Sequence, residues 1–356
     1  MIAVASDFRS AYLSLEAFGK QSAQWRGSML GTVCFTPLTH DALPDALDAP
    51  FAPVSMPALD IDGTAETSCE AWFTAGPVVY GRRDSLYFGH DADLLFGSIQ
   101  LDEATFASPE AAADGKTPLQ RAAESAYTAI FALMDELRFP HVLRFWNYIS
   151  DINAECHGLE RYRQFNMGRQ DGFIRRGRQT AGSVVPAASA VGCDAGPLTV
   201  YFLAGRGAKP IAIENPRQVS AYHYPAQYGP RAPTFSRASV ARIGDADMLL
   251  ISGTASIVGH QSVHVGDVPG QVRETVENLK AIVHQANLAA PQAQFVLEDL
   301  CFKAYVRNAS DVTVIDRELR QRLGASARIL YLRADICRQD LLVEIEATGG
   351  HPLDLL

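Results

Sequence analysis

Two glutamates in the C-terminal part of the sequence are spaced like side chains that share one face of a strand. Residues 331–346 read YLRADICRQDLLVEIE, and the last positions alternate apolar with acidic, so Glu344 and Glu346 are expected to point the same way. If that face is buried, the loss of hydration raises the pKa of a carboxyl and suits it to donate a proton near neutral pH. If the face is open to water, which the pattern alone favours, both are surface carboxylates. Cys337, seven residues before Glu344, belongs to the same site or is a small core hydrophobe.

A cluster of arginines follows a predicted strand that contains Tyr148. Residues 160–169 read ERYRQFNMGR and include Arg163. Guanidinium groups bind carboxylates through paired hydrogen bonds, so the cluster suits an anionic ligand. A solvated helix with ion pairs between successive turns explains the same charges, and composition alone favours that alternative.

A segment rich in tyrosine, arginine and proline occupies residues 222–237, YHYPAQYGPRAPTFSR. Its prolines make a continuous helix improbable, so Tyr222, Tyr228 and Arg231 are expected on an ordered loop. Such a loop either binds a ligand or packs its tyrosines over the core with their hydroxyls bonded to the backbone. The residue types favour neither alternative.

Motifs for other common chemistries are absent from the sequence. It has no Walker A motif, no HExxH and no G-x-S-x-G. His260 and His264 are four apart, but the residues around them lack helical periodicity, so a metal-binding pair is not expected. We expect neither a metal nor a cofactor.

The composition is that of a globular protein. Of its 356 residues 47% are hydrophobic and 20% charged, and no apolar run of 18 residues could cross a membrane. The net charge of -9 opposes nucleic-acid binding. The six cysteines form no C-x-x-C pair, so reduced thiols are expected. No secretory signal is apparent at the start, and the expected compartment is the cytoplasm.

The hydrophobic pattern predicts an α/β (α+β) protein with mixed sheets and helices on one face. In the C-terminal half, apolar periodicity predicts a helix over residues 270–287. Predicted strands of this half are residues 198–204, 248–257, 302–307, 328–333 and 341–347.

The N-terminal half repeats this order, with a strand at residues 93–100, a helix at 119–137 and a strand at 142–148. Two related halves with a shared interface follow from the repetition. The small residues of 179–196 predict a boundary near residue 190, which gives domains 1–190 and 191–356.

The order of strands and helix after residue 248, with the strand FKAYVRN and the ending LLVEIEA, resembles the RidA (YjgF) fold. RidA-like domains assemble as trimers with ligand clefts between subunits. A chain with two such domains is therefore expected to form a cleft internally and to be a monomer.

Four motifs in their expected order also resemble the chorismatase family, which joins an N-terminal domain to a RidA-like one. They are RFWNYISDINAECHGLERYRQFNMGR, SAYHYPAQYGPRAPTFSRA, ISGTASI and YLRADICRQDLLVEIEA. The resemblance implies that chorismate is the substrate and that Glu344 is the catalytic acid. It also implies that arginines and tyrosines hold the substrate, and the matching positions are Arg163, Tyr228, Arg231, Arg307, Tyr148 and Tyr222.

The product is implied by a second pair of residues. A Gly in ISGTAS, here Gly253, with a Cys seven residues before the acid, here Cys337, implies the type that releases pyruvate and 3-hydroxybenzoate. Gly253 is expected to leave room for the 4-hydroxyl of chorismate. A branch that also forms 4-hydroxybenzoate stays open. So do hydrolysis to a dihydroxycyclohexadiene carboxylate, a RidA-like imine or enamine deaminase, and a non-catalytic ligand sensor.

Overall fold

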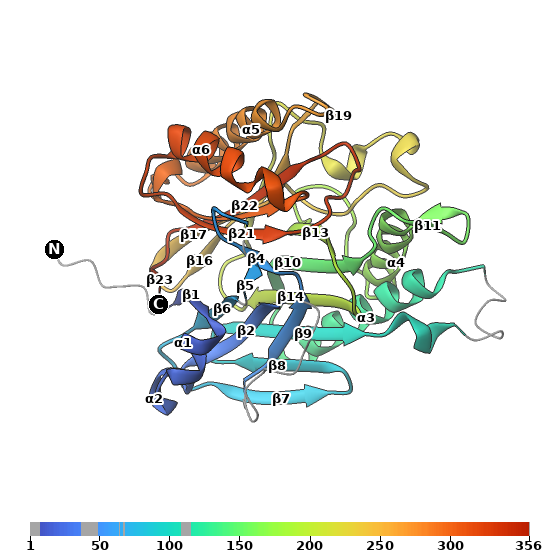
Figure 1. The fold of residues 1–356 in the computed structure, drawn as a ribbon. Helices are drawn as coiled ribbons and strands as arrows, with labels where there is room; N and C mark the ends of the chain where they lie inside the picture. Colours follow the sequence, from blue (N-terminus) through green and yellow to red (C-terminus); the bar gives the residue numbers. More distant parts are fainter. Residues whose placement is uncertain (1–7, 37–48, 64, 67, 108–114, 356) are drawn as a thin grey trace.

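A computed structural model describes residues 8–36, 49–63, 65–66, 68–107 and 115–355 (Figure 1). One sheet is built from the N-terminal half. Its strand order is β13 (Ala187–Cys193), β10 (His141–Ser150), β14 (Leu198–Gly205), β9 (Leu94–Leu101), β8 (Leu86–His90) and β7 (Val79–Arg83). Helices α3 (Pro118–Leu137) and α4 (Arg161–Arg175) pack on one face of this sheet through a shared apolar cluster.

A second sheet contains the strands of the C-terminal half. Its order is β15 (Ile211–Ile213), β16 (Ala238–Ile243), β17 (Ala246–Ala255), β22 (Val343–Gly349), β20 (Cys301–Val306), β21 (Arg328–Arg333), β4 (Ala58–Leu59) and β5 (Ala65–Glu66). Helices α5 (Val268–Ala289) and α6 (Val312–Leu323) cover its outer face, at the top of Figure 1. The predicted α+β fold and the predicted strands and helices are confirmed, while α6 is an addition to them.

A third sheet was not predicted. It contains β23 (Leu353–Leu355), β1 (Arg9–Ser14), β6 (Ser68–Phe73), β2 (Met29–Thr36) and β3 (Phe51–Ser55) in that order, and the short helices α1 (Leu15–Lys20) and α2 (Ala23–Arg26) follow β1. Cys34 on β2 lies directly opposite Cys69 on β6, and the two form a disulfide. The expectation of reduced thiols is therefore wrong for this pair, because sheet register brings together cysteines that are far apart in sequence.

The faces of the sheets that carry no helices meet in a central apolar core. Trp146, Tyr148 and Tyr201 from the N-terminal sheet and Tyr305 from the C-terminal sheet are fully buried there. The Trp146 and Tyr201 rings stack with centroids 4.5 Å apart. This packing holds β22, which carries both glutamates, against the N-terminal sheet.

The predicted boundary near residue 190 lies within β13. The next strand, β14, pairs with both β10 and β9, so the chain leaves the N-terminal sheet only after Gly205. The N-terminal strands β4 and β5 extend the C-terminal sheet, which crosses the proposed division in the other direction. The division into domains 1–190 and 191–356 stays a prediction. In the part of the chain that the structure describes, no helix is long and apolar enough to cross a membrane.

Candidate active site

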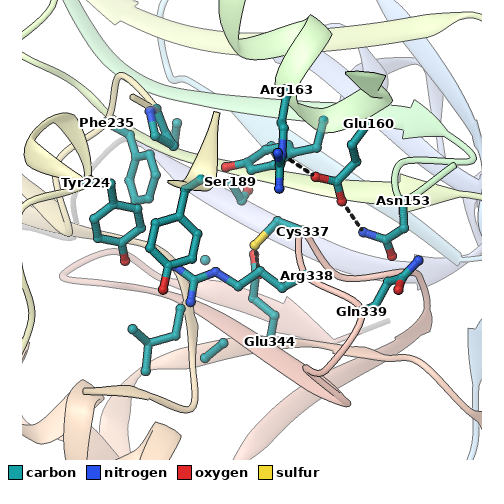
Figure 2. Close-up of a pocket in the computed structure, with 18 of the residues that line it drawn as sticks. Asn153, Glu160, Arg163, Ser189, Tyr224, Phe235, Cys337, Arg338, Gln339 and Glu344 are labelled. Atoms are coloured by element: carbon teal, nitrogen blue, oxygen red, sulfur yellow. Dashed lines mark hydrogen bonds and ion pairs between the residues drawn. The ribbon is translucent and has the colours of Figure 1, made fainter. Parts of the chain in front are cut away.

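A cavity of about 380 Å³ lies between the two halves of the chain (Figure 2). The N-terminal half supplies residues of α4 and β13, and the C-terminal half supplies β17, β22 and two loops. Lining side chains that the argument uses are Arg163, Arg169, Tyr228, Arg237, Cys337 and Glu344. The cavity therefore exists only when both halves are folded together.

Glu344 is buried at the floor of this cavity. It is 4% exposed and lies on β22, where strand pairing on both sides holds the backbone in place. Burial raises the pKa of Glu344 to about 8, and the nearby carboxylate of Glu346 contributes in the same direction. The carboxyl is thus protonated near neutral pH, as a general acid requires.

Glu346, on the same face of β22, has the opposite ionisation. Burial alone would raise its pKa, but Lys303, Arg144 and a hydrogen bond from Ser189 lower the pKa of Glu346 to about 2. A pair of carboxyls whose pKa values are driven apart in this way provides one acid and one permanent anion. The alternative of a wet surface face is excluded, since Glu346 is 3% exposed.

Cys337 lies beside the acid. Its Sγ is 3.9 Å from Glu344 Oε2, and Figure 2 shows the sulfur directed at that carboxyl, on the side that faces Arg163. Burial and the neighbouring Glu344 raise the pKa of the Cys337 thiol far above its ordinary value. The group is therefore a neutral thiol and not a nucleophilic thiolate.

Gly253 lies where β17 departs from regular pairing with β22, between Ile251 and Thr254. A Cβ at this position would be 1.9 Å from Glu344 Oε1 and 2.8 Å from its Cδ. The glycine thus lets β17 approach the acid closely. Sequence analysis gave this room to the substrate hydroxyl, but the structure fills it with the carboxyl of Glu344.

Gly253→Ala is expected to displace the Glu344 carboxyl and to lower turnover by about 10²-fold, the effect of a misplacement of roughly 1 Å. Gly205→Ala is the matched control, because a Cβ on that strand glycine meets nothing closer than 3.4 Å. Steady-state rates of both variants check the prediction. Equal rates for Gly253→Ala and the unaltered protein would contradict it.

Two arginines in the cavity have nitrogen atoms that are not paired with the protein. Arg169 is 2% exposed, and its Nε and Nη2 have no hydrogen-bond partner among the described residues. Arg237 donates through Nη2 to the carbonyl of Val219 and to the hydroxyl of Tyr224, but its buried Nε is likewise unpaired in the described part of the chain. Unpaired buried guanidinium groups are costly, so they indicate a site for an anionic ligand.

The chain is similar in sequence to enzymes of known activity. It is 38% identical over 295 residues to a 3-hydroxybenzoate synthase of Streptomyces hygroscopicus, across 80% of this chain and 82% of that relative. A chorismatase of Streptomyces rapamycinicus is 38% identical over 287 residues, across 79% of this chain and 82% of the relative. The chain belongs to the chorismatase family.

A family model and a solved structure agree with this assignment. The model described as chorismatase FkbO/Hyg5-like, N-terminal, matches residues 70–204 and so ends within β14. A crystal structure of a chorismatase matches with a TM-score of 0.83 at 32% identity, over 96% of this chain and 98% of that one. The likeness to a solved chorismatase therefore includes both sides of the cavity.

Some residues that the chorismatase resemblance implied do line the cavity. Glu344, Cys337, Gly253, Arg163 and Tyr228 are all among its lining residues. Arg163 is partly exposed and pairs with Glu160 at 3.0 Å, which places it toward the solvent side. The Tyr228 hydroxyl donates to the carbonyl of His260 at 2.6 Å, so this loop is held against the C-terminal half.

Other predicted substrate-binding residues lie outside the cavity, and these predictions are corrected. Arg231 forms an ion pair with Asp171, which ties the 222–237 loop to α4. Tyr148 is buried in the central core, with its hydroxyl 3.3 Å from that of Tyr305. Tyr222 packs edge-on against His223, away from the cavity lining.

Arg307 also lies outside the cavity, but it shapes one wall. Its guanidinium donates to the carbonyls of Leu341, Ile336 and Arg338 and pairs with Asp335 at 2.6 Å. These contacts fold residues 335–341 into the loop that presents Cys337 and Arg338. Arg307 is thus an organiser of the loop and not a contact for the ligand.

Sequence analysis missed several lining residues of this chorismatase-family site. Arg169, Tyr224, Arg237 and Arg338 all line the cavity. Arg338 stacks over the rings of Tyr224 and Tyr228, at 5.3 and 4.2 Å from their centroids. Arg169 and Arg237 did stand within the two basic segments singled out from the sequence, but nothing in those segments distinguished the arginines that would be buried.

Proposed function

We propose that this protein converts chorismate to pyruvate and 3-hydroxybenzoate. The observation that carries the proposal is a buried, protonated Glu344 at the floor of a cavity that also presents unpaired guanidinium nitrogens. An acid held in a dry site can protonate carbon, and cations in the same site compensate an anionic substrate. The names of the relatives, 3-hydroxybenzoate synthase and chorismatase, support the same substrate and product.

The chemistry begins at the enolpyruvyl group of chorismate, which is a vinyl ether. Transfer of the Glu344 proton to the methylene carbon forms a methyl group and an oxocarbenium ion, and this weakens the bond between C3 and oxygen. The 4-hydroxyl oxygen then displaces that oxygen within the molecule, pyruvate leaves with the bonding electrons, and the hydroxyl proton returns to Glu344. Chorismate is isomeric with hydroxybenzoic acid plus pyruvic acid, so the aromatic route consumes no water.

The carboxylates of chorismate are proposed to lie against Arg169 and Arg237, with Arg163 on the solvent side. Arg169 and Arg237 carry the buried Nε atoms that lack partners in the described residues, and paired N–H donors match a carboxylate. Arg163 is already paired with Glu160. Tyr228 is proposed to contact the ring hydroxyl from the loop side.

Incubation of the protein with chorismate, with pyruvate followed by lactate dehydrogenase, tests the activity. Chromatography of the aromatic products then gives the ratio of 3- to 4-hydroxybenzoate and detects any dihydroxycyclohexadiene carboxylate. We expect pyruvate and 3-hydroxybenzoate in equal amounts. No pyruvate above background would leave the imine or enamine deaminase and the ligand sensor as the remaining candidates.

Cys337→Ala is expected to lower the share of 3-hydroxybenzoate among the products, because the thiol is proposed to contact the ring edge during rearrangement. A neutral thiol 3.9 Å from Glu344 Oε2 is well placed for that contact. Cys156→Ala, which removes a cysteine that does not line the cavity, is the control. Product analysis checks the ratio, and an undiminished share in Cys337→Ala would remove the proposed role.

The proposed assembly is a monomer, because residues of both halves of one chain line the cavity. The proposed compartment is the cytoplasm. The Cys34–Cys69 disulfide is unusual for that compartment, so fractionation of cells that produce the protein is the relevant test. Gel filtration of the purified protein tests the assembly.

A further inference from the structure

The two glutamates on β22 have very different surroundings. Glu346 accepts hydrogen bonds from Arg144 Nη2 at 2.9 Å, Trp146 Nε1 at 2.8 Å and Ser189 Oγ at 2.7 Å, and it pairs with Lys303 Nζ at 3.0 Å. Both of its oxygens are thus satisfied by donors, and two of the donors are cations. This set of partners stabilises the charged form of Glu346 and excludes the protonated form.

Glu344 has almost none of these partners. Within the described residues its side chain has one hydrogen-bond contact, the long one from Cys337 Sγ. The charged and titratable groups that face it from the elements packed around it are Glu346 of β22, Arg144 of β10, Tyr162 of α4, and Arg237 and Cys337 of the loops. Of these neighbours only Glu346 carries a negative charge near neutral pH.

We propose that Glu346 is a positioning residue for the reaction, a fixed anion that keeps the proton on Glu344. Two carboxylates on one buried strand face repel each other, so when one is held charged the other is favoured in its neutral form. The inference rests on the proposed function, in which Glu344 donates that proton. It adds a residue that does not line the cavity and does not touch the substrate.

The chain offers a matched control in the same buried network. Lys303 Nζ also pairs with Glu70 Oε2 at 2.8 Å, and Glu70 in turn accepts from the Tyr201 hydroxyl at 2.9 Å. Glu70 is 2% exposed, so Glu70→Gln removes a buried anion and leaves Lys303 less compensated, as Glu346→Gln does. Glu70 lies on β6, and it does not contribute to the raised pKa of Glu344.

The test measures the proton on Glu344 directly. Infrared spectroscopy follows the carbonyl band of the protonated acid, assigned by its loss in Glu344→Gln, as the pH is raised. We expect the band of the unaltered protein to disappear near pH 8. In Glu346→Gln its midpoint should fall by at least ~1 pH unit, the size typical of a close buried charge, while Glu70→Gln changes it far less.

Pyruvate release provides the second readout. Activity of the unaltered protein should fall as the pH rises through the pKa of Glu344, and in Glu346→Gln this alkaline limb should move to lower pH by the same amount as the infrared midpoint. Activity of the variant should then recover toward the unaltered level when the pH is lowered. A merely structural role would lower the rate equally at every pH and would leave the limb in place.

Glu346→Gln leaves Arg144 and Lys303 without their shared carboxylate, so the double variant Arg144→Gln/Glu346→Gln, which removes an ion pair as a unit, is measured beside it. It should show the same shift. A folded variant whose infrared midpoint equals that of the unaltered protein overturns the inference, and so does a failure of both variants to fold, since the network would then be structural. The infrared measurement needs no chorismate, so a protein that shows the shift but releases no pyruvate would contradict the proposed function instead.

Discussion

Glu344→Gln is expected to lose nearly all pyruvate release while it still binds chorismate. The amide preserves the size of the side chain in its buried place between β17 and β20, but it has no acidic proton to transfer to the methylene carbon. General acids contribute about 10²- to 10⁴-fold to rates, and protonation of carbon places this step at the upper end. Steady-state rates measure the loss, and equilibrium binding of chorismate to the variant measures what remains.

The control for this variant is Glu277→Gln, an exposed glutamate of α5 that pairs with Lys280. It should have the rate of the unaltered protein. If Glu344→Gln kept more than about a tenth of the rate, well within the effect of losing a general acid, another group would have to supply the proton. If it lost binding as well, the amide would have disturbed the cavity, and the rate would not report on chemistry.

Arg169→Met is expected to weaken chorismate binding on the order of 10²-fold, the loss typical of a buried charge-assisted contact. The guanidinium is enclosed by the rings of Tyr127, Phe145 and Phe173, with Cζ 5.1 to 5.6 Å from their centroids. Burial lowers the pKa of Arg169 from its ordinary value, which shows that the protein without ligand holds this charge at a cost. The cost is offset when a substrate carboxylate binds.

This reasoning separates function from stability. Because methionine has the stem of arginine without its charge, the thermal midpoint of Arg169→Met should not fall and should rise if the unpaired charge is the larger effect. Arg175→Met, on the exposed side of α4, should retain substrate affinity. Calorimetry with and without chorismate checks both claims. A large fall in the midpoint would make Arg169 a structural residue and contradict its assignment to the ligand.

The strands and long helices were predictable because their patterns are local. The apolar periodicity of residues 270–287 and 119–137 matches α5 and α3, and the strand predicted at 328–333 has the observed bounds of β21. Alternation in VEIE also placed Glu344 and Glu346 on one face correctly. These features depend on a few neighbouring residues, whose spacing is visible in the sequence itself.

The partners of those glutamates were not predictable in this way. Arg144 is 202 positions from Glu346 in the chain, and only packing of the two sheets brings them together. The same holds for the Cys34–Cys69 disulfide, which depends on the register of β2 against β6. Arg231 and Arg307 were chosen by residue type within the right segments, but type alone does not say whether a guanidinium faces a cavity, a carboxylate or a row of carbonyls.

The network of Glu70, Arg144, Lys303 and Glu346 has a consequence for how the chain acquires activity. It joins residues up to 233 positions apart, so the loops between them must close before any of these contacts forms. Until then Glu344 is an ordinary hydrated carboxylate that is ionised at neutral pH. A partly folded chain therefore has no acid to offer, and the proton that the reaction needs is taken up only as the fold is completed.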